Sequence, residues 1–337
     1  VALNYSAYIG HTALRVYAMG AEAVGRAARP DEVDKMAGIV REAVSAGAAG
    51  FATSFAVTHR GADGQPIPSR WADRDEIRSL CQAVADAGRG VVGINGGENL
   101  SFKECYELQE EVGIPFTYTA VLTTPSGAHV KAAEINRAGW ARGARVWPQV
   151  SCRPLSFSMH MGEPFTLNIN PVFAELMPKS QAEKRAAFAD PVWRARAREY
   201  WAGSNTLPPR WDSFEVMESQ VHPELVGKRI QALAEQAGVD AFEFLMEITV
   251  AEREPRDLRV KAILANDDAD GITMLLREPN TTLGLSDAGA HVGQLCDAPL
   301  STDLLGNWVR DRHTISLEAA IRKLSGQQAD IFNFTDR

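Results

Sequence analysis

The stretch Thr281-Thr282-Leu283-Gly284-Leu285-Ser286-Asp287-Ala288-Gly289-Ala290-His291 decides how we interpret the rest of the chain. A short apolar run ends abruptly at an acidic residue, and small residues and a histidine follow it. This pattern predicts a buried strand with Asp287 at its carboxyl end, a standard position for a metal ligand or a proton shuttle. The other interpretation is that Asp287 caps the next turn by accepting backbone N–H bonds. The stretch alone leaves both interpretations open.

Apolar runs earlier in the chain predict further strands, and helical periodicity appears between them. The predicted strands cover 1–9, 48–54, 90–95, 114–122, 145–151 and 281–287. Their alternation with helices predicts parallel βα units. A complete barrel needs eight strands, so six strands fit a barrel whose first two strands are absent, and a doubly wound open sheet is the alternative. Pro148 in the fifth strand predicts an edge-like or irregular element.

Other segments interrupt or close this alternation. Residues 55–72 have no periodicity and predict a long loop of the kind that often carries function. Residues 152–222 are rich in aromatic residues and prolines and predict a lid-like insertion. A closing helix is expected at 316–325, with Leu317, Ile321 and Leu324 on one apolar face.

The composition excludes several classes of protein. The net charge of −8 gives no general attraction to nucleic acid or anionic membranes. No apolar run reaches the length of a membrane span. The cysteines form no C-x-x-C pair, so we expect reduced thiols and a cytoplasmic location; they are Cys81, Cys105, Cys152 and Cys296. Since the chain opens on a strand-like segment without Met, we expect it to be part of a longer protein.

Two common motifs are nearly matched. Residues 284–288 resemble the G-x-S-x-G nucleophile elbow, but Ala288 replaces the last glycine. Residues 93–97 could form a backbone nest for an anion but lack the spacing of a P-loop, which favours a tight turn. Neither His11 nor His291 belongs to an H-x-H pair, and because each follows a strand they could face one site.

Four segments together resemble the amidohydrolase superfamily, specifically its N-acyl-D-amino-acid deacylase (D-aminoacylase-like) branch. They are Ile9–Arg15 (IGHTALR), Ala48–Ser54 (AAGFATS), Gly284–Asp287 with His291, and Ala319–Ser325 (AAIRKLS). Each segment is moderately specific, and their order and spacing strengthen the resemblance.

The resemblance implies a (β/α)8 metal-dependent barrel of the TIM type joined to a small β-sandwich. The six predicted strands would be barrel strands three to eight, so residues 1–337 would be an incomplete barrel domain, with the first strands and the sandwich outside this chain. Family histidines are expected near 93–96 and 118–121, and this sequence has none there. The resemblance therefore implies one zinc ion, bound by Asp287 and by ligands upstream of this chain.

The implied activity is metal-dependent hydrolysis of a linear, non-peptide C–N amide bond in an N-acyl-amino-acid-like small molecule. Asp287 would accept a proton from the attacking water and pass it to the leaving amine. Asn95, Glu98, His11 and His291 are candidates to contact substrate. The cations that could grip a substrate carboxylate are Arg60, Arg70 and Arg153. The alternative is a catalytically silent barrel that binds a small molecule or a partner; the oligomeric state is open.

Overall fold

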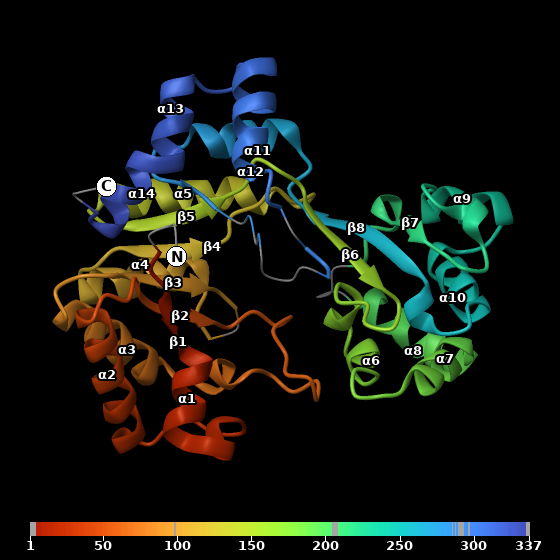
Figure 1. The fold of residues 1–337 in the computed structure, drawn as a ribbon, viewed down its shortest axis with the longest axis horizontal. Coiled ribbons are helices and arrows are strands. Elements are labelled where there is room, and N and C mark those ends of the chain that lie inside the picture. The colour runs from red at the N-terminus through yellow and green to blue at the C-terminus, as the bar shows by residue number, and fades with distance from the viewer. Residues whose placement is uncertain are drawn as a thin grey trace.

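The computed structural model describes residues 5–97, 99–203, 208–284, 286, 288, 293–295 and 297–334. Its largest element is a six-stranded parallel sheet of order β1-β2-β3-β4-β5-β9 (Figure 1). The strands are β1 (Tyr8–Gly10), β2 (Gly50–Ser54), β3 (Val91–Asn95), β4 (Phe116–Thr119), β5 (Val146–Val150) and β9 (Thr282–Leu283). All six predicted strands are present, and their parallel pairing confirms the predicted α/β class.

The edges of this sheet are β1 and β9, and within the described ranges no pairing joins them to close a barrel. The interpretation of the strand around Pro148 as edge-like was wrong, because β5 lies between β4 and β9. The proline is accommodated because β9 pairs only with Gln149 and Val150, which leaves the Pro148 position free of a partner on that side.

Helices pack against one face of the sheet. They are α1 (His11–Met19), α2 (Pro30–Ser45), α3 (Arg74–Asp86), α4 (Phe102–Val112) and α5 (Ala128–Ala141), with short turns η1 (Gly20–Ala23) and η2 (Pro68–Trp71). Helix α3 begins after Asp73, whose side chain accepts a hydrogen bond from the Glu76 backbone N–H. Their apolar faces meet the outward residues of the strands, such as Phe51, Ile94 and Phe116, in one buried core.

The opposite face of the sheet is lined by small and polar residues. A Cβ built on Gly93 would lie 3.5 Å from Ala52 Cβ, 3.5 Å from the Tyr8 ring and 3.7 Å from Thr117 Oγ1. These residues therefore share one face, which points away from the helices because strand side chains alternate. We call it the inner face of the sheet.

The predicted insertion forms a separate lobe that extends further than the predicted range of 152–222. This insertion lobe (residues 155–265) lies beside the six-stranded sheet (Figure 1). It contains an antiparallel sheet of order β6-β8-β7 and has its own aromatic-rich core. Its elements are β6 (Leu155–His160), η3 (Leu167–Ile169), α6 (Pro171–Ala174), α7 (Gln181–Ala189), α8 (Pro191–Ala202), η4 (Trp211–Ser213), β7 (Glu215–Glu218), η5 (Pro223–Leu225), α9 (Ile230–Ala237), α10 (Ala241–Ala251), η6 (Pro255–Asp257) and β8 (Arg259–Ala265).

The C-terminal part returns to the main sheet and adds a third core around β5 and β9. Its elements are α11 (Ala269–Arg277), α12 (Leu300–Asp303), η7 (Leu304–Asp311), α13 (Leu317–Ile321), η8 (Arg322–Gly326) and α14 (Gln327–Phe332). The predicted buried face of the closing helix was wrong: Leu317 is 54% and Ile321 46% exposed, whereas Ala320 and Lys323 are buried. None of the described helices has the length and apolar character needed to span a membrane.

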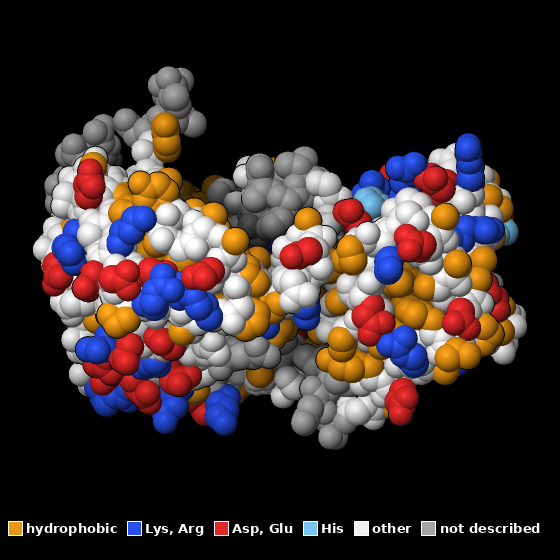
Figure 2. All heavy atoms as spheres, turned by 90° about the horizontal axis from the view of Figure 1, so that it is seen from below, with side chains coloured by type: hydrophobic (Ala, Val, Ile, Leu, Met, Phe, Trp, Pro, Cys, Tyr) orange, Lys and Arg blue, Asp and Glu red, His pale blue; other side chains and the backbone are white. Residues whose placement is uncertain are grey.

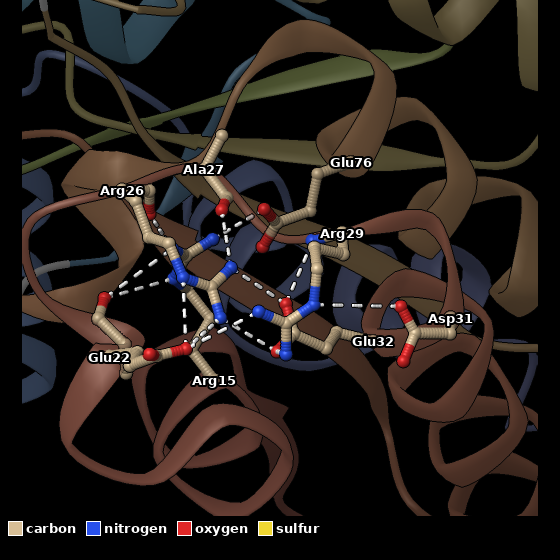
Figure 3. Close-up of polar contacts among 9 residues, drawn as sticks. Arg15, Glu22, Arg26, Ala27, Arg29, Asp31, Glu32 and Glu76 are labelled. Atoms are coloured by element: carbon tan, nitrogen blue, oxygen red, sulfur yellow. Dashed lines mark hydrogen bonds and ion pairs between the residues drawn. The ribbon is translucent and has the colours of Figure 1, made fainter.

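A network of ionic side chains fixes α1, α2 and α3 to one another (Figure 3). Arg15 and Glu76 are fully buried and form an ion pair between α1 and α3. Arg26 donates two bonds of 2.8 Å to the carboxylate of Glu32, and Arg15 Nη2 donates to the Arg26 carbonyl at 2.6 Å. Because each buried charge has a partner, the network satisfies groups that would otherwise destabilise the core.

The outer surface of this region is charged but carries both signs. Figure 2 shows Lys, Arg, Asp and Glu side chains interspersed over its left-hand part, while hydrophobic side chains are more frequent over the right-hand part. The visible face therefore lacks a large patch of a single charge, in keeping with the modest net charge of −8.

Candidate active site

Three polar side chains form a row where β2, β3 and β4 end. Ser54 pairs in register with Asn95, and Asn95 pairs with Thr119. Neighbouring strands lie about 4.8 Å apart, so the three side chains follow one another along the carboxyl edge. They continue the inner face of Ala52 and Gly93, and each is half-buried. In parallel α/β folds this edge is where ligands bind.

The loop after β2 adds His59 to this row. Ser54 Oγ and His59 Nδ1 lie 2.6 Å apart, and Ser69 Oγ donates to the Ser54 carbonyl at 2.8 Å. The loop is closed further on, where Gly61 N donates to the Gln65 carbonyl at 2.8 Å. A hydroxyl–imidazole pair is thus held at the carboxyl edge, and such a pair can hold or move a proton.

At the other end of the row, Gln149 lies against the end of β9. A Cβ on Gly284 would lie 2.6 Å from Gln149 Oε1, so the absence of a side chain at Gly284 leaves room for this amide in its present position. The row therefore consists of hydroxyl, amide and imidazole groups.

A cavity of about 290 Å³ opens beside this edge. Arg60, the residue after His59, contributes to its wall, and Gln294 contributes from the chain after β9. The remaining wall comes from residues 162–188 of the insertion lobe. The loop after β2 and the chain after β9 thus line the same cavity as the insertion lobe.

His11, a predicted substrate contact, lies on the helix side of the sheet. Its ring nitrogens are 2.8 Å from Thr53 Oγ1 and 2.8 Å from Glu76 Oε1, and the ring stands edge-on to Phe51. Burial lowers the pKa of His11, although the neighbouring Glu76 opposes this shift. The geometry therefore gives His11 a structural part in joining α1 to β2 and α3.

The three predicted carboxylate-gripping arginines lie in different surroundings. Arg60 lines the cavity of about 290 Å³, whereas Arg70 faces a separate open depression with Asn99. Arg153 pairs with Asp297 and Asp303. The structure therefore places only Arg60 at the cavity beside the row.

Asn95 lies where the sequence predicts, at the carboxyl end of β3. Among the described residues its side chain has no hydrogen-bond partner, so its amide is available to a ligand. Asp287, Glu98 and His291 lie outside the described residues, and their predicted roles stay predictions.

The described residues do not fit a zinc site by themselves. Within the ranges given above, no group of three or more His, Cys, Asp or Glu side chains is arranged to hold a metal ion. A catalytic zinc commonly takes three protein ligands, and the row of Ser54, Asn95, Thr119 and Gln149 provides only neutral oxygen and amide groups. We therefore derive no step through a metal.

Two residues of this region, His59 and Ser54, were not among the predicted site residues. His59 lies in the loop that was predicted to be functional, and its position five residues after the strand end was the available signal. Ser54 is the last residue of a predicted strand, yet nothing in the sequence shows that the loop folds back to bring His59 onto it.

Comparisons with known proteins show relatives over almost the whole chain. No family model matches. Uncharacterized proteins from Mycobacterium tuberculosis and Mycobacterium bovis are 26% identical over 365 residues, covering 98% of this chain and 58% of their own length. This chain therefore spans less than two thirds of the length of these relatives.

Solved structures also match over almost the whole of this chain. A D-aminoacylase structure that describes its binuclear metal centre matches with a TM-score of 0.59 at 18% identity, covering 100% of this chain and 59% of that one. An N-acyl-D-glutamate deacylase from Bordetella bronchiseptica, complexed with zinc and a phosphonate inhibitor, matches with a TM-score of 0.60 at 19% identity and covers 99% of this chain. This chain therefore has the fold of D-aminoacylases, a subset of the amidohydrolases.

Proposed function

We propose that this chain carries the barrel part of a hydrolase that cleaves the linear C–N amide bond of an N-acyl-amino-acid-like substrate. The observation that carries the proposal is the fold it shares, over its whole described length, with D-aminoacylase and N-acyl-D-glutamate deacylase. The row of polar side chains at the carboxyl edge supports it, because this edge holds the active sites of parallel α/β barrels.

In this proposal the chain's own residues bind the amide and move protons. The Asn95 amide donates a hydrogen bond to the substrate carbonyl oxygen, where negative charge develops as water attacks. Asp287 accepts the proton of the attacking water and later delivers it to the leaving amine. The Ser54–His59 pair lies in the same row and orients the loop that borders the bound substrate.

A zinc ion bound by Asp287 is a finer part of the same proposal. When bound, zinc would polarise the carbonyl group and lower the pKa of water. Support comes from the zinc in the N-acyl-D-glutamate deacylase structure, whereas the described residues of this chain supply no three-ligand group.

The second candidate is a barrel that binds a small molecule without catalysis, and the observation that favours it is the neutral amide of Asn95 at the end of β3, where the family resemblance leads one to expect a histidine. Metal analysis of the full-length purified protein separates the two. About one zinc per chain supports the hydrolase, and much less than one supports the silent barrel.

The decisive test is turnover of N-acyl amino acids by the full-length protein. A panel of N-acetyl and longer N-acyl derivatives of both enantiomers is offered, and the released amine is measured. Asp287→Asn should reduce kcat by a factor on the order of 10² to 10⁴, the contribution of general acid–base catalysis. Asp34→Asn removes an exposed carboxylate on α2 and is the matched control. Unchanged turnover in Asp287→Asn would sink the proposed role.

A further inference from the structure

The cavity beside the carboxyl edge lies at the meeting of two parts of the molecule. Its walls come from the loop after β2 and from the insertion lobe. The two parts are in direct contact, because a Cβ on Gly64 would lie 3.4 Å from the Ala174 carbonyl of α6. The volume of about 290 Å³ is close to the lower end of small-molecule pockets, which is about 300 Å³.

Two cations face this cavity. Lys184 is only 4% exposed, and its ammonium group donates to the Gly162 carbonyl at 2.8 Å. Arg60 Nη1 donates to the Gly64 carbonyl at 2.9 Å, while its buried Nε has no partner in the part of the chain that the structure describes. Both side chains therefore keep donor capacity for a ligand.

The charges around the cavity are not balanced. Neither cation has a described carboxylate within ion-pair distance, and Glu163, the one acidic residue in the described wall, is exposed. Burial lowers the pKa of Lys184, and Glu163 opposes this shift. Two positive groups against one negative group leave a single positive charge, which a monoanion would neutralise.

The rest of the wall is apolar. Phe165, Phe173, Leu176, Met177 and Phe188 face the same space. Phe173 and Phe188 are each 1% exposed and belong to the core of the insertion lobe, so this side of the cavity is firmly packed. A ligand that fits must therefore carry an apolar body next to its charged group.

We propose that this cavity binds one carboxylate group carried on an apolar body, with the carboxylate on Lys184 and Arg60 and the body against the phenylalanines and Met177. If the proposed hydrolase function holds, on which this step rests, the ligand is the amino-acid half of the substrate. The substrates are then N-acyl derivatives of large apolar amino acids. An amino acid with an acidic side chain is disfavoured, because Glu163 repels a second carboxylate.

Binding of a carboxylate that cannot be hydrolysed tests this inference separately from catalysis. Isothermal titration calorimetry on the full-length protein uses 3-phenylpropionate and its neutral amide, 3-phenylpropionamide. The acid should bind at least about tenfold more tightly than the amide, the scale of a lost charge-assisted hydrogen bond. Equal affinity for acid and amide would overturn the proposal.

Variants locate the binding. Lys184→Met keeps the apolar stem but removes the charge, and should weaken binding of 3-phenylpropionate about tenfold or more. Arg60→Met tests the same site at a partly exposed loop residue. The proposal therefore stays testable even when the variant of the buried Lys184 fails to fold. Lys179→Met, at a half-exposed lysine paired with Glu183, is the control and should bind normally. Normal binding in both cavity variants would contradict the inference.

The two proposals can fail independently. Binding of 3-phenylpropionate without turnover of any N-acyl amino acid supports the cavity site and contradicts the hydrolase. Turnover of N-acetylphenylalanine with unchanged KM in Arg60→Met and Lys184→Met supports the hydrolase and contradicts the cavity site.

Discussion

Asn95 stands where the family resemblance leads one to expect a histidine, and its surroundings give that exchange a chemical meaning. The side chain continues the inner face of the sheet and lies in register with Ser54 and Thr119. An amide can donate to an oxygen that gains negative charge, but it is a poor ligand for zinc compared with imidazole. Asparagine at this position therefore suits the proposed role of binding the substrate carbonyl better than the role of a metal ligand.

We expect Asn95→Ala to lower kcat/KM for amide hydrolysis by a factor on the order of 10² to 10³, since that is the cost of removing one donor to a developing oxyanion. Steady-state kinetics with the best N-acyl substrate measure it. Gln82→Ala removes an exposed amide on α3 and should leave kcat/KM unchanged. Asn95→Ala with the activity of the native protein would assign the oxyanion role to another group.

Glu32 gives a residue-scale prediction for acid stability. Hydrogen bonds from Arg26, assisted by the Arg29 backbone, lower the pKa of Glu32 from 4.5 to about 2. The folded pKa lies below the unfolded pKa, so the stabilisation is fully present above about pH 4.5 and is lost as the pH falls towards 2. Glu32→Gln should therefore be less stable than the native protein at pH 7 and approach it near pH 2.

Urea unfolding at a series of pH values between 7 and 2 checks this. The control is Glu175→Gln, which breaks the exposed pair with Arg196 and should cost little at any pH. A stability difference for Glu32→Gln that stays constant down to pH 2 would contradict the linkage.

At the scale of elements, the order of strands and the main helices followed from the sequence because apolar periodicity reports burial directly. Asp73 and Ser101 cap α3 and α4, and side chains of these types are common at helix starts. The prediction of the buried face of the closing helix was wrong for a physical reason. Its buried side is held by Lys323, whose ammonium donates to the carbonyls of Glu278 and Thr281, and a pattern of apolar residues cannot show that a lysine is the anchor.

The candidate site was harder to predict than the fold, because it depends on how loops return to the sheet. The meeting of His59 with Ser54, and of Arg60 with Lys184 across the cavity, joins segments whose relative placement no periodicity describes. His11 shows that the position of a residue in the sequence does not fix the direction of its side chain. It follows the end of β1, which led us to expect it at the carboxyl edge, but its side chain points towards the helices and contacts Glu76.

Asn266 joins the insertion lobe to the main sheet. Its Nδ2 donates to the carbonyls of Ser151 and Arg153 at 2.8 and 2.7 Å, and its Oδ1 accepts from Thr123 N at 3.1 Å. The residue is fully buried with a φ of 66°. One side chain therefore satisfies three backbone groups at the junction.

We expect Asn266→Ala to lower the free energy of unfolding by about 3 kcal/mol, because buried backbone groups lose their partners. Urea denaturation measures it. Asn266→Gly tolerates the left-handed backbone but also lacks the side chain, so it should retain most of this loss. A glycine variant as stable as the native protein would show that backbone strain, not hydrogen bonding, is responsible.

At the scale of the whole molecule, the chain enters and leaves the insertion lobe at a single place. Its first and last strand residues, Leu155 and Ala265, are partners in register. The cores of the main sheet include no residue of the lobe, and the lobe has a core of its own. Residues of both parts line the cavity proposed as the ligand site.

Replacing residues 156–264 with a short glycine-containing turn should therefore leave the main sheet folded while removing the cavity. Far-UV circular dichroism and a cooperative urea transition test the fold, and calorimetry with 3-phenylpropionate tests binding. Loss of cooperative unfolding would show that the main sheet depends on the lobe for its stability.

The pairing of Leu155 with Ala265 also has a consequence for the order of folding. Gln149 and Thr282 pair in the main sheet although the whole lobe lies between them in the chain. Closing so long a loop in one step carries a large entropic cost and slows folding. Once the lobe has collapsed around its own core, its two ends lie side by side, and the separation that β5 and β9 must bridge becomes short. We therefore expect early collapse of the lobe to bring β5 and β9 together and to speed the addition of the last strand of the sheet.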